Sequence, residues 1–165
     1  APLGAHRRML DALRSAVDAA AEPPGGVPRR LYISRRDSMK RRMENEPDVE
    51  AALARLGFRA VTLTGMPFAP QARLVRGAEI LAGPHGAGLA HLLLAEPGTA
   101  VFEIMPGTVT GALMTTCMSR LSRLMGHRHL IWLEASSPLA ADWTVNLQAM
   151  LPAVEAFAAE AGPLR

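Results

Sequence analysis

Residues 80–105 read ILAGPHGAGLAHLLLAEPGTAVFEIM, and this stretch decides the fold. The two short apolar runs at its ends, EILAG and AVFEIM, have the length and the branched side chains of buried strands. Between them, the glycine-rich PHGAG opens an apolar helix, and Pro97-Gly98 closes it. A strand, a turn, a helix and a second strand make one crossover unit, so the sequence predicts a parallel sheet here.

The glycine-rich turn resembles an anion site. A helix that begins at this turn directs its free backbone N–H groups and the positive end of its dipole beyond the strand ends, where phosphate commonly binds. Gly86 and Gly88 would let the backbone approach a ligand closely because neither has a Cβ. His85 can donate a hydrogen bond or a partial charge to the same anion. We interpret His85, Gly86, Ala87 and Gly88 as a cradle for phosphate or pyrophosphate.

Two other interpretations of the turn were weighed. It matches neither the Walker loop nor the GxGxxG fingerprint, so its glycines can also serve only a tight strand-to-helix turn. An oxyanion hole like the HGGG loop of esterases requires a GxSxG nucleophile elbow. The sequence contains no GxSxG, which excludes that mechanism.

The composition indicates one aliphatic globular domain. Of its 165 residues, 49% are hydrophobic, 20% are charged and only 4% are aromatic. The net charge is +3, but basic side chains gather in residues 29–42, RRLYISRRDSMKRR. Such a patch suits an anionic small molecule, or it is a solvated charged surface. Nucleic acid is the weaker interpretation, because few aromatic side chains are available to stack on bases.

The single cysteine, Cys117, excludes an intramolecular disulfide and the common zinc patterns. Its apolar neighbours predict a small buried side chain. No apolar run is long enough to cross a membrane, and the first residues do not form a signal peptide. We therefore expect a cytoplasmic protein, either free or at the inner face of the membrane.

Strand and helix patterns alternate along the chain. Residues 1–28 are predicted to form an N-terminal helix (4–21) and a linker, and residues 29–165 a single domain. The predicted strands cover 31–34, 59–63, 79–83, 100–105 and 128–135. The predicted helices outside the glycine-rich unit cover 47–56, 69–76, 109–125 and 146–161. This alternation predicts an α/β fold, a Rossmann-like parallel sheet with helices on both faces.

In a sheet of this kind the ligand lies beyond the C-terminal ends of the strands. The loops that follow the first four predicted strands cover 34–46, 64–70, 83–88 and 105–110. They bring the arginine cluster, a Met-Pro-Phe loop, the glycine-rich turn and an acidic strand end to one rim. This convergence favours the cradle interpretation over a plain tight turn.

Several separate motifs resemble those of family-61 glycosyltransferases. They are LYISRRDSMKRRMENEPDVEAALARLGF, Gln71, AEILAGPHGAGLAHLLLAEPGTAVFEIMP and the closing DWTVNLQAML, in the family's order and spacing from about Arg29 onward. Members of this family include bacterial capsular-polysaccharide biosynthesis proteins, plant xylan-decorating transferases and animal O-linked N-acetylglucosaminyltransferases. The resemblance implies the C-terminal, donor-binding half of a GT-B enzyme. The Ala- and Arg-rich composition favours a bacterial source.

The resemblance also implies a reaction. Its members transfer a sugar from a nucleotide sugar, typically a UDP-sugar, to a glycan or polysaccharide acceptor, with inversion and without a bound metal or other cofactor. The sequence has no DxD metal motif. Positive charge and N–H donors are then needed to stabilise the leaving diphosphate. Arg35 and Arg41 match the family motif and can each hold phosphate oxygens with two parallel hydrogen bonds. Their neighbours Arg36, Lys40 and Arg42 are expected to be solvated flanks.

Three further donor-site candidates each have two interpretations. Asn45 either binds the donor or caps the following helix, whose first turn favours Glu46. Gln71 either hydrogen-bonds the nucleotide or braces its own loop. Glu103, on a strand just before the rim, either binds the ribose hydroxyls or is a buried carboxylate paired with an arginine.

Two functional hypotheses follow. The chain is the donor-binding domain of a glycosyltransferase, or it is a non-catalytic nucleotide-binding or interaction module that lacks the acceptor domain. No residue is an evident general base, and GT-B enzymes usually place the base in the N-terminal domain. We therefore expect a fragment that binds nucleotide and works with a missing acceptor domain. Among the remaining histidines, His91 is predicted to pack in the core, and His127 and His129 have no evident partner.

Overall fold

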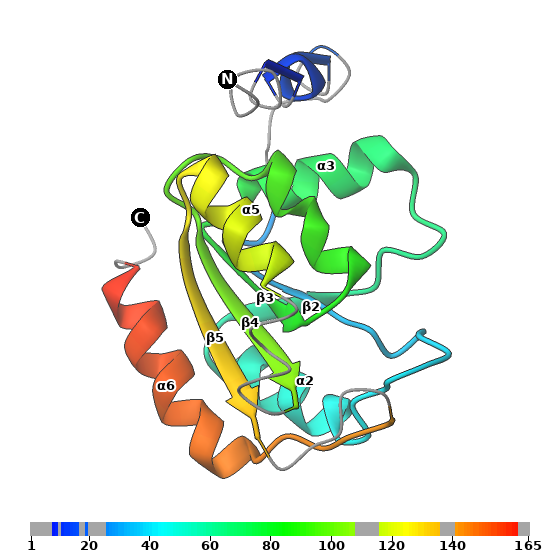
Figure 1. Cartoon of the computed structure of the whole chain (residues 1–165), viewed down its shortest axis with the longest axis vertical. Helices are drawn as coiled ribbons and strands as arrows, with labels where there is room; N and C mark the ends of the chain where they lie inside the picture. The colour runs from blue at the N-terminus through cyan, green and yellow to red at the C-terminus, as the bar shows by residue number, and fades with distance from the viewer. Residues whose placement is uncertain are drawn as a thin grey trace.

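The computed structural model describes residues 8, 9, 11–16, 19, 26–107, 116–135 and 141–161. Its centre is a five-stranded sheet in which every pair of neighbouring strands is parallel (Figure 1). The strands, in chain order, are β1 (Arg30–Ile33), β2 (Phe58–Val61), β3 (Ile80–Pro84), β4 (Ala100–Pro106) and β5 (Arg128–Glu134). The predicted parallel α/β fold is confirmed, and each predicted strand ends within two residues of the observed one.

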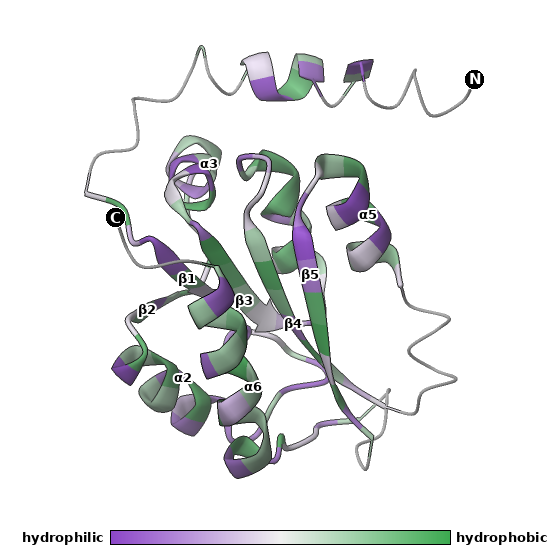
Figure 2. Ribbon diagram, turned by 90° about the vertical axis from the view of Figure 1, so that its left-hand side faces the viewer, coloured by the Kyte–Doolittle hydropathy of each residue, from purple (hydrophilic) through white to green (hydrophobic). Residues whose placement is uncertain are grey.

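Helices cover both faces of the sheet (Figure 2). One face carries α2 (Glu46–Arg55) and α6 (Leu147–Glu160). The other carries α3 (Phe68–Gly77), the 3-10 helix η1 (Ala87–Leu94) and α5 (Cys117–Met125). Because neighbouring residues of a strand point to opposite faces, each central strand supplies both cores. Phe102 enters the core under α2 and α6, whereas Val101 enters the core under α3, η1 and α5.

The helices begin and end at residues suited to those positions. Pro47 stands in the first turn of α2, where its missing N–H costs nothing. Gly57 and Gly126 follow α2 and α5 with φ of 80° and 77°, a left-handed conformation that glycine adopts without strain. Asn146 caps α6, because its side chain accepts the Ala149 N–H at 3.1 Å.

The predicted apolar helix after the glycine-rich turn forms as the 3-10 helix η1, whose buried residues are Leu89, Leu92 and Leu94. One expectation about the helices was wrong. Cys117 is exposed at the start of α5 instead of buried, and the buried face of that helix contains Ser122 and Met125. Most of the predicted helix before residue 116 lies outside the described residues.

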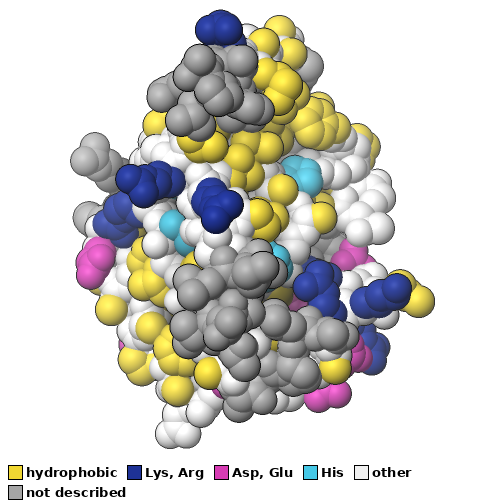
Figure 3. Space-filling model, viewed as in Figure 1, with side chains coloured by type: hydrophobic (Ala, Val, Ile, Leu, Met, Phe, Trp, Pro, Cys, Tyr) yellow, Lys and Arg dark blue, Asp and Glu magenta, His cyan; other side chains and the backbone are white. Residues whose placement is uncertain are grey.

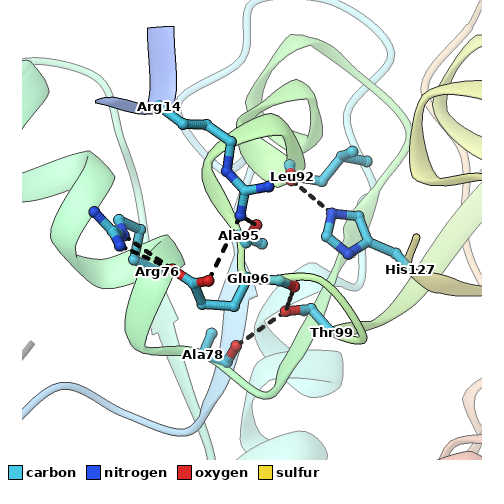
Figure 4. A network of polar contacts seen from close by, with 8 residues as sticks. All are labelled: Arg14, Arg76, Ala78, Leu92, Ala95, Glu96, Thr99 and His127. Atoms are coloured by element: carbon cyan, nitrogen blue, oxygen red, sulfur yellow. Dashed lines mark hydrogen bonds and ion pairs between the residues drawn. The ribbon is translucent and has the colours of Figure 1, made fainter. Parts of the chain in front are cut away.

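The N-terminal segment is helical at the residues that the structure describes. Arg14 attaches it to the domain: its Nη2 donates to the Ala95 carbonyl at 2.5 Å and lies 3.7 Å from the Glu96 carboxylate (Figure 4). Met9 and Leu13 are 64% and 41% exposed, so the predicted apolar face is largely open to solvent here. Among the described residues, no helix combines the length and the apolar character that a membrane crossing needs.

The strand order is β2-β1-β3-β4-β5, which reverses direction between β1 and β3. The chain leaves β1 toward α2 on one face and leaves β3 toward η1 on the other. In doubly wound sheets of this order, ligands bind where two such loops diverge. The two strands lie very close at this point: a Cβ on Gly83 would come within 2.7 Å of the Ile33 carbonyl oxygen.

We expect Gly83→Ala to lower the free energy of unfolding by about 1–3 kcal/mol, since neither backbone can move without breaking the β1–β3 pairing. Chemical denaturation followed by circular dichroism measures this. Gly65→Asn is the matched control: Gly65 has φ of 77° and open space around its Cα, and Asn tolerates this conformation. An unchanged midpoint for Gly83→Ala would contradict the close approach of the two strands.

Candidate functional site

Arg35 follows β1 directly and joins the two diverging loops. Its Nη1 donates to the His85 carbonyl, in the turn after β3, at 2.6 Å, and its Nη2 donates to Ser38 Oγ at 3.0 Å. Burial, and then the positive charge of Arg41, lower the pKa of Arg35 from its ordinary value. The two arginines therefore repel each other, and both belong to the loop after β1, where Lys and Arg side chains gather on the surface (Figure 3).

The glycine-rich turn is packed against this loop. A Cβ on Gly86 would lie 2.9 Å from Arg35 Cζ, and a Cβ on Gly88 would lie 3.0 Å from Ile33 Cγ2. The absence of a Cβ at Gly86 and Gly88 thus makes room for the Arg35 and Ile33 side chains. The close approach of a ligand to these glycines stays a prediction. Ala87 is exposed between them at the first position of η1, where helical N–H groups have no partner within the helix.

A buried polar network lies behind the turn. Glu103 of β4 is fully buried, with Oε1 at 2.5 Å from His85 Nδ1 and Oε2 at 2.8 Å from His129 Nε2. The other ring nitrogen of His129 lies 2.7 Å from Ser122 Oγ on α5. Burial alone would raise the pKa of Glu103, but the hydrogen bonds from His129 and His85 outweigh it and hold that pKa below its ordinary value. Glu103 is thus a buried carboxylate held by two histidines.

This network corrects two expectations. Among the described residues the partners of Glu103 are histidines and not an arginine, and its side chain is fully buried instead of open to a ribose. His129, which had no evident partner in the sequence, is bonded through both ring nitrogens. The register of β4 with β5 explains this contact. Val101 pairs with His129, so Glu103 and His129 lie on the same face of neighbouring strands. Among the described residues, no group of three or more His, Cys, Asp or Glu could hold a metal ion.

Glu46 is the first residue of α2, but its side chain is buried against the Arg35 backbone instead of exposed to solvent. Its Oε1 accepts the Tyr32 hydroxyl at 2.9 Å and the Arg35 backbone N–H at 2.8 Å, and it is only 1% exposed. Burial raises the pKa of Glu46 above its ordinary value. Asn45 does not cap α2: its side-chain amide donates to the Val145 carbonyl at 2.8 Å and accepts the Val145 N–H at 3.1 Å. The sequence did not indicate the hydrogen bond from Tyr32 to Glu46, because a tyrosine in an apolar strand predicts a core side chain.

Residues 142–146, from the closing DWTVN motif, clamp the basic loop. Asp142 accepts the Arg42 backbone N–H at 2.8 Å and its Nε–H at 3.0 Å. The Trp143 indole donates to the Arg41 carbonyl at 3.2 Å. Arg41 has φ of 53°, and no other non-glycine residue in the described part of the chain has a positive φ. We call residues 142–146 the strap, because it holds the loop in this strained course.

The remaining candidates have structural partners. Gln71 braces the loop after β2, because its Nε2 donates to the Leu63 carbonyl at 3.1 Å and the Met66 carbonyl at 2.7 Å. Arg36, expected to be a solvated flank, is half-exposed and pairs with Glu50 at 3.0 Å. The rim loop after β4 lies outside the described residues from residue 108 onward.

A hollow of about 470 Å³ lies at the opposite edge of the sheet, by the N-terminal strand ends. Its lining arginines are occupied: Arg76 pairs with Glu96 at 2.8 Å (Figure 4), and Arg128 donates to the Glu160 carbonyl at 3.0 Å. The basic stretch 29–42 is also divided between the two edges, because Arg30 begins β1 and only the part after β1 reaches the diverging loops. The candidate donor-site residues lie at the C-terminal edge of the sheet, away from this hollow.

Comparison with known proteins identifies a family. The model of the family Glycosyltransferase 61 matches residues 2–102, which includes the N-terminal segment that the sequence motifs did not reach. An EGF domain-specific O-linked N-acetylglucosamine transferase from Drosophila melanogaster is 32% identical over 114 residues, 67% of this chain and 21% of that protein. The beta-1,2-xylosyltransferase XAX1 from Oryza sativa subsp. japonica is 35% identical over 101 residues, 61% of this chain and 18% of that protein. A beta-1,2-xylosyltransferase from Arabidopsis thaliana is 28% identical over 126 residues, 63% of this chain and 23% of that protein. The chain thus spans about a fifth of the length of these relatives.

We expect the Glu103 carboxylate to stabilise the fold at neutral pH and to lose this effect in acid. Its folded-state pKa lies below the ordinary value of 4.5, so the unfolded chain takes up the proton first as the pH falls. Stability is then lost as the pH drops through the folded-state pKa, by at most about 1.4 kcal/mol per pH unit. Urea unfolding of wild type and Glu103→Gln between about pH 6 and pH 3 measures the effect, and the difference between them should shrink toward low pH.

The control is Glu155→Gln, which changes an exposed carboxylate on α6 and should follow the wild type at each pH. A difference between wild type and Glu103→Gln that stays constant with pH would show that Glu103 is not ionised in the fold.

Proposed function

The chain belongs to the glycosyltransferase 61 family, and from this premise we propose that it is the donor-nucleotide-binding domain of a glycosyltransferase. The donor is a nucleotide sugar, specifically a UDP-sugar, and the acceptor is a glycan or polysaccharide. The observation that carries the proposal is the position of Arg35, whose guanidinium bridges the loops after β1 and β3 at the point where the strand order reverses. The names of the relatives describe transfer of N-acetylglucosamine and xylose by those proteins.

Two arginines and a helix start supply the charge for the diphosphate. Arg35 uses two of its guanidinium N–H groups within the protein, which leaves others for phosphate oxygens. Arg41 lowers the pKa of Arg35 by repulsion, and an anion that binds both would replace this repulsion with two attractions. The N–H groups at the start of η1 lie in the turn that Arg35 contacts.

The proposed reaction is an inverting transfer without a bound metal. The acceptor hydroxyl loses its proton to a general base and attacks the anomeric carbon, while the bond from that carbon to the β-phosphate oxygen breaks and the nucleoside diphosphate leaves with the electron pair. Arg35, Arg41 and the N–H groups of the turn stabilise the negative charge that grows on this leaving group. The acceptor and the base are assigned to a separate acceptor domain, as the sequence resemblance implies.

A non-catalytic nucleotide-binding or interaction module is the second candidate, because no general base was identified among the residues of this chain. Both candidates predict UDP binding, and only the first predicts sugar transfer or UDP-sugar hydrolysis once the acceptor domain is supplied. The cytoplasmic location, the capsule role and the bacterial source expected from the sequence stay predictions, and the relatives named above come from a fly and two plants.

We expect the chain to bind UDP more tightly than ADP or GDP in calorimetric titrations without divalent metal. Arg35→Lys keeps the charge but loses the fork of N–H donors, so it should weaken UDP binding at least about tenfold. Arg36→Ala, next to it on the exposed flank, is the control and should bind as the wild type does. Equal affinity for the three nucleotides, or an Arg35→Lys variant with full affinity, would contradict the proposal.

Gly86→Ala should weaken UDP binding and leave the fold intact. The backbone at Gly86 is extended, so alanine fits there without strain, but its Cβ would lie 2.9 Å from Arg35 Cζ and would push the guanidinium aside. Because only the end of a flexible side chain must move, the melting temperature should stay near the wild-type value. Gly65→Asn is again the control. Full UDP affinity in a folded Gly86→Ala protein would show that the position of Arg35 does not matter.

A further inference from the structure

We propose that binding of the diphosphate is coupled to uptake of a proton by His85, and that Glu103 and His129 are the positioning residues for this coupling. The inference rests on the proposed function, and it adds a residue role and a pH dependence to the same site. Its starting point is the buried network of a carboxylate between two histidines at the C-terminal edge of the sheet.

Glu103 fixes which nitrogen of His85 can titrate. A carboxylate only accepts hydrogen bonds, so the His85 Nδ1 that lies 2.5 Å from Glu103 Oε1 carries a hydrogen. The pKa of Glu103 lies below its ordinary value, which agrees with an ionised acceptor. The proton equilibrium of the ring is therefore left to Nε2. That atom makes no hydrogen bond within the described part of the chain, and the His85 side chain keeps 12% of its surface exposed.

A phosphate ligand requires a hydrogen on Nε2. When the ring is neutral, Nε2 presents a lone pair and repels a phosphate oxygen, which also offers only lone pairs. When the ring is protonated, Nε2 donates a hydrogen bond and adds a positive charge. The anion therefore favours the protonated ring, and by thermodynamic reciprocity a proton on the ring tightens anion binding to the same extent.

Two charges act on the His85 ring in opposite directions. The Glu103 carboxylate, which is bonded to Nδ1, favours a positive ring. Arg35 bonds the His85 carbonyl, and its positive charge opposes a second positive charge beside it. An arriving diphosphate neutralises Arg35 and removes this opposition. The charged or titratable groups on the elements around the ring are Glu103, His129, Arg35, Arg41, Glu46 and His91.

His129 holds the second oxygen of Glu103. It donates from Nε2 to Oε2 at 2.8 Å, and its Nδ1 meets Ser122 Oγ, a hydroxyl that can donate to a neutral ring. Without His129, Oε2 would be buried with no partner, and the carboxylate would be free to turn or to take up a proton itself. His129 therefore keeps Glu103 ionised and aimed at His85 without contacting the ligand.

Proton uptake is measured by calorimetric titration with UDP at about pH 7.5 in buffers that differ in ionisation enthalpy. The observed binding enthalpy is plotted against the ionisation enthalpy of the buffer, and the slope gives the number of protons taken up. The terminal phosphate of free UDP is largely ionised at this pH, since such a group titrates near about pH 6. We expect uptake of up to one proton in the wild type. His85→Gln keeps an N–H donor but cannot titrate, so it should bind UDP more weakly with almost no uptake.

The positioning residues are tested in the same way. Glu103→Gln should reduce the uptake and weaken UDP binding about tenfold at this pH, and His129→Gln should reduce the uptake by a smaller amount. His127→Gln is the matched control, because His127 bonds the Leu92 carbonyl at the opposite edge of the sheet; it should equal the wild type. The His85 ring signal in NMR spectra of the wild type, titrated with and without UDP, gives the same answer if a variant does not fold.

The outcomes separate the two proposals. UDP binding without proton uptake, or with uptake that persists in His85→Gln, overturns this inference and leaves the proposed function standing. Absence of UDP binding in the wild type overturns both. Uptake that disappears in His85→Gln but is unchanged in Glu103→Gln and His129→Gln overturns the role given to the network and leaves His85 as the proton acceptor.

Discussion

The close pairing of β1 and β3 is the constraint on which the site depends. At Gly83 the two backbones approach so closely that no side chain fits between them, and from this point the chain leaves toward opposite faces of the sheet. Arg35 begins one departing loop and His85 the other, and a 2.6 Å hydrogen bond from the guanidinium to the His85 carbonyl ties the loops together. The strand order thus determines where the two loops diverge, and Arg35 and His85 in these loops supply the polar and charged groups there.

Two buried carboxylates near this edge have pKa values that shift in opposite directions. Glu103 receives hydrogen bonds from two imidazoles, and these bonds outweigh burial and lower its pKa. Glu46 receives bonds from a tyrosine hydroxyl and a backbone N–H, which do not outweigh burial, and its pKa rises. Glu103 is therefore the more readily ionised of the two, whereas Glu46, beside the Arg35 backbone, is more easily protonated.

The fold, and the contact between Arg35 and the glycine-rich turn, could be predicted from the sequence, because both depend on local pattern. Alternating strand and helix signals give a parallel sheet, and the sheet places Arg35 and the glycine-rich turn at one edge. The partners of the buried polar groups could not be predicted in this way. Glu103 meets His129 through the register of β4 with β5, and Asn45 meets Val145 across 100 residues, so both contacts depend on tertiary structure.

The strap has a consequence for the order in which the protein acquires its binding surface. The bonds from Trp143 to Arg41 and from Val145 to Asn45 each join residues at least 100 positions apart, and they are the contacts that hold the arginine loop in its strained course. During synthesis all five strands leave the ribosome before the strap does. Until the strap is made, nothing holds the arginine loop in its final course. Bringing the strap to the loop then costs the conformational entropy of closing a segment of about 100 residues. Arg41 and the loop around it are therefore among the last parts of the domain to take their final places, after the sheet can already form.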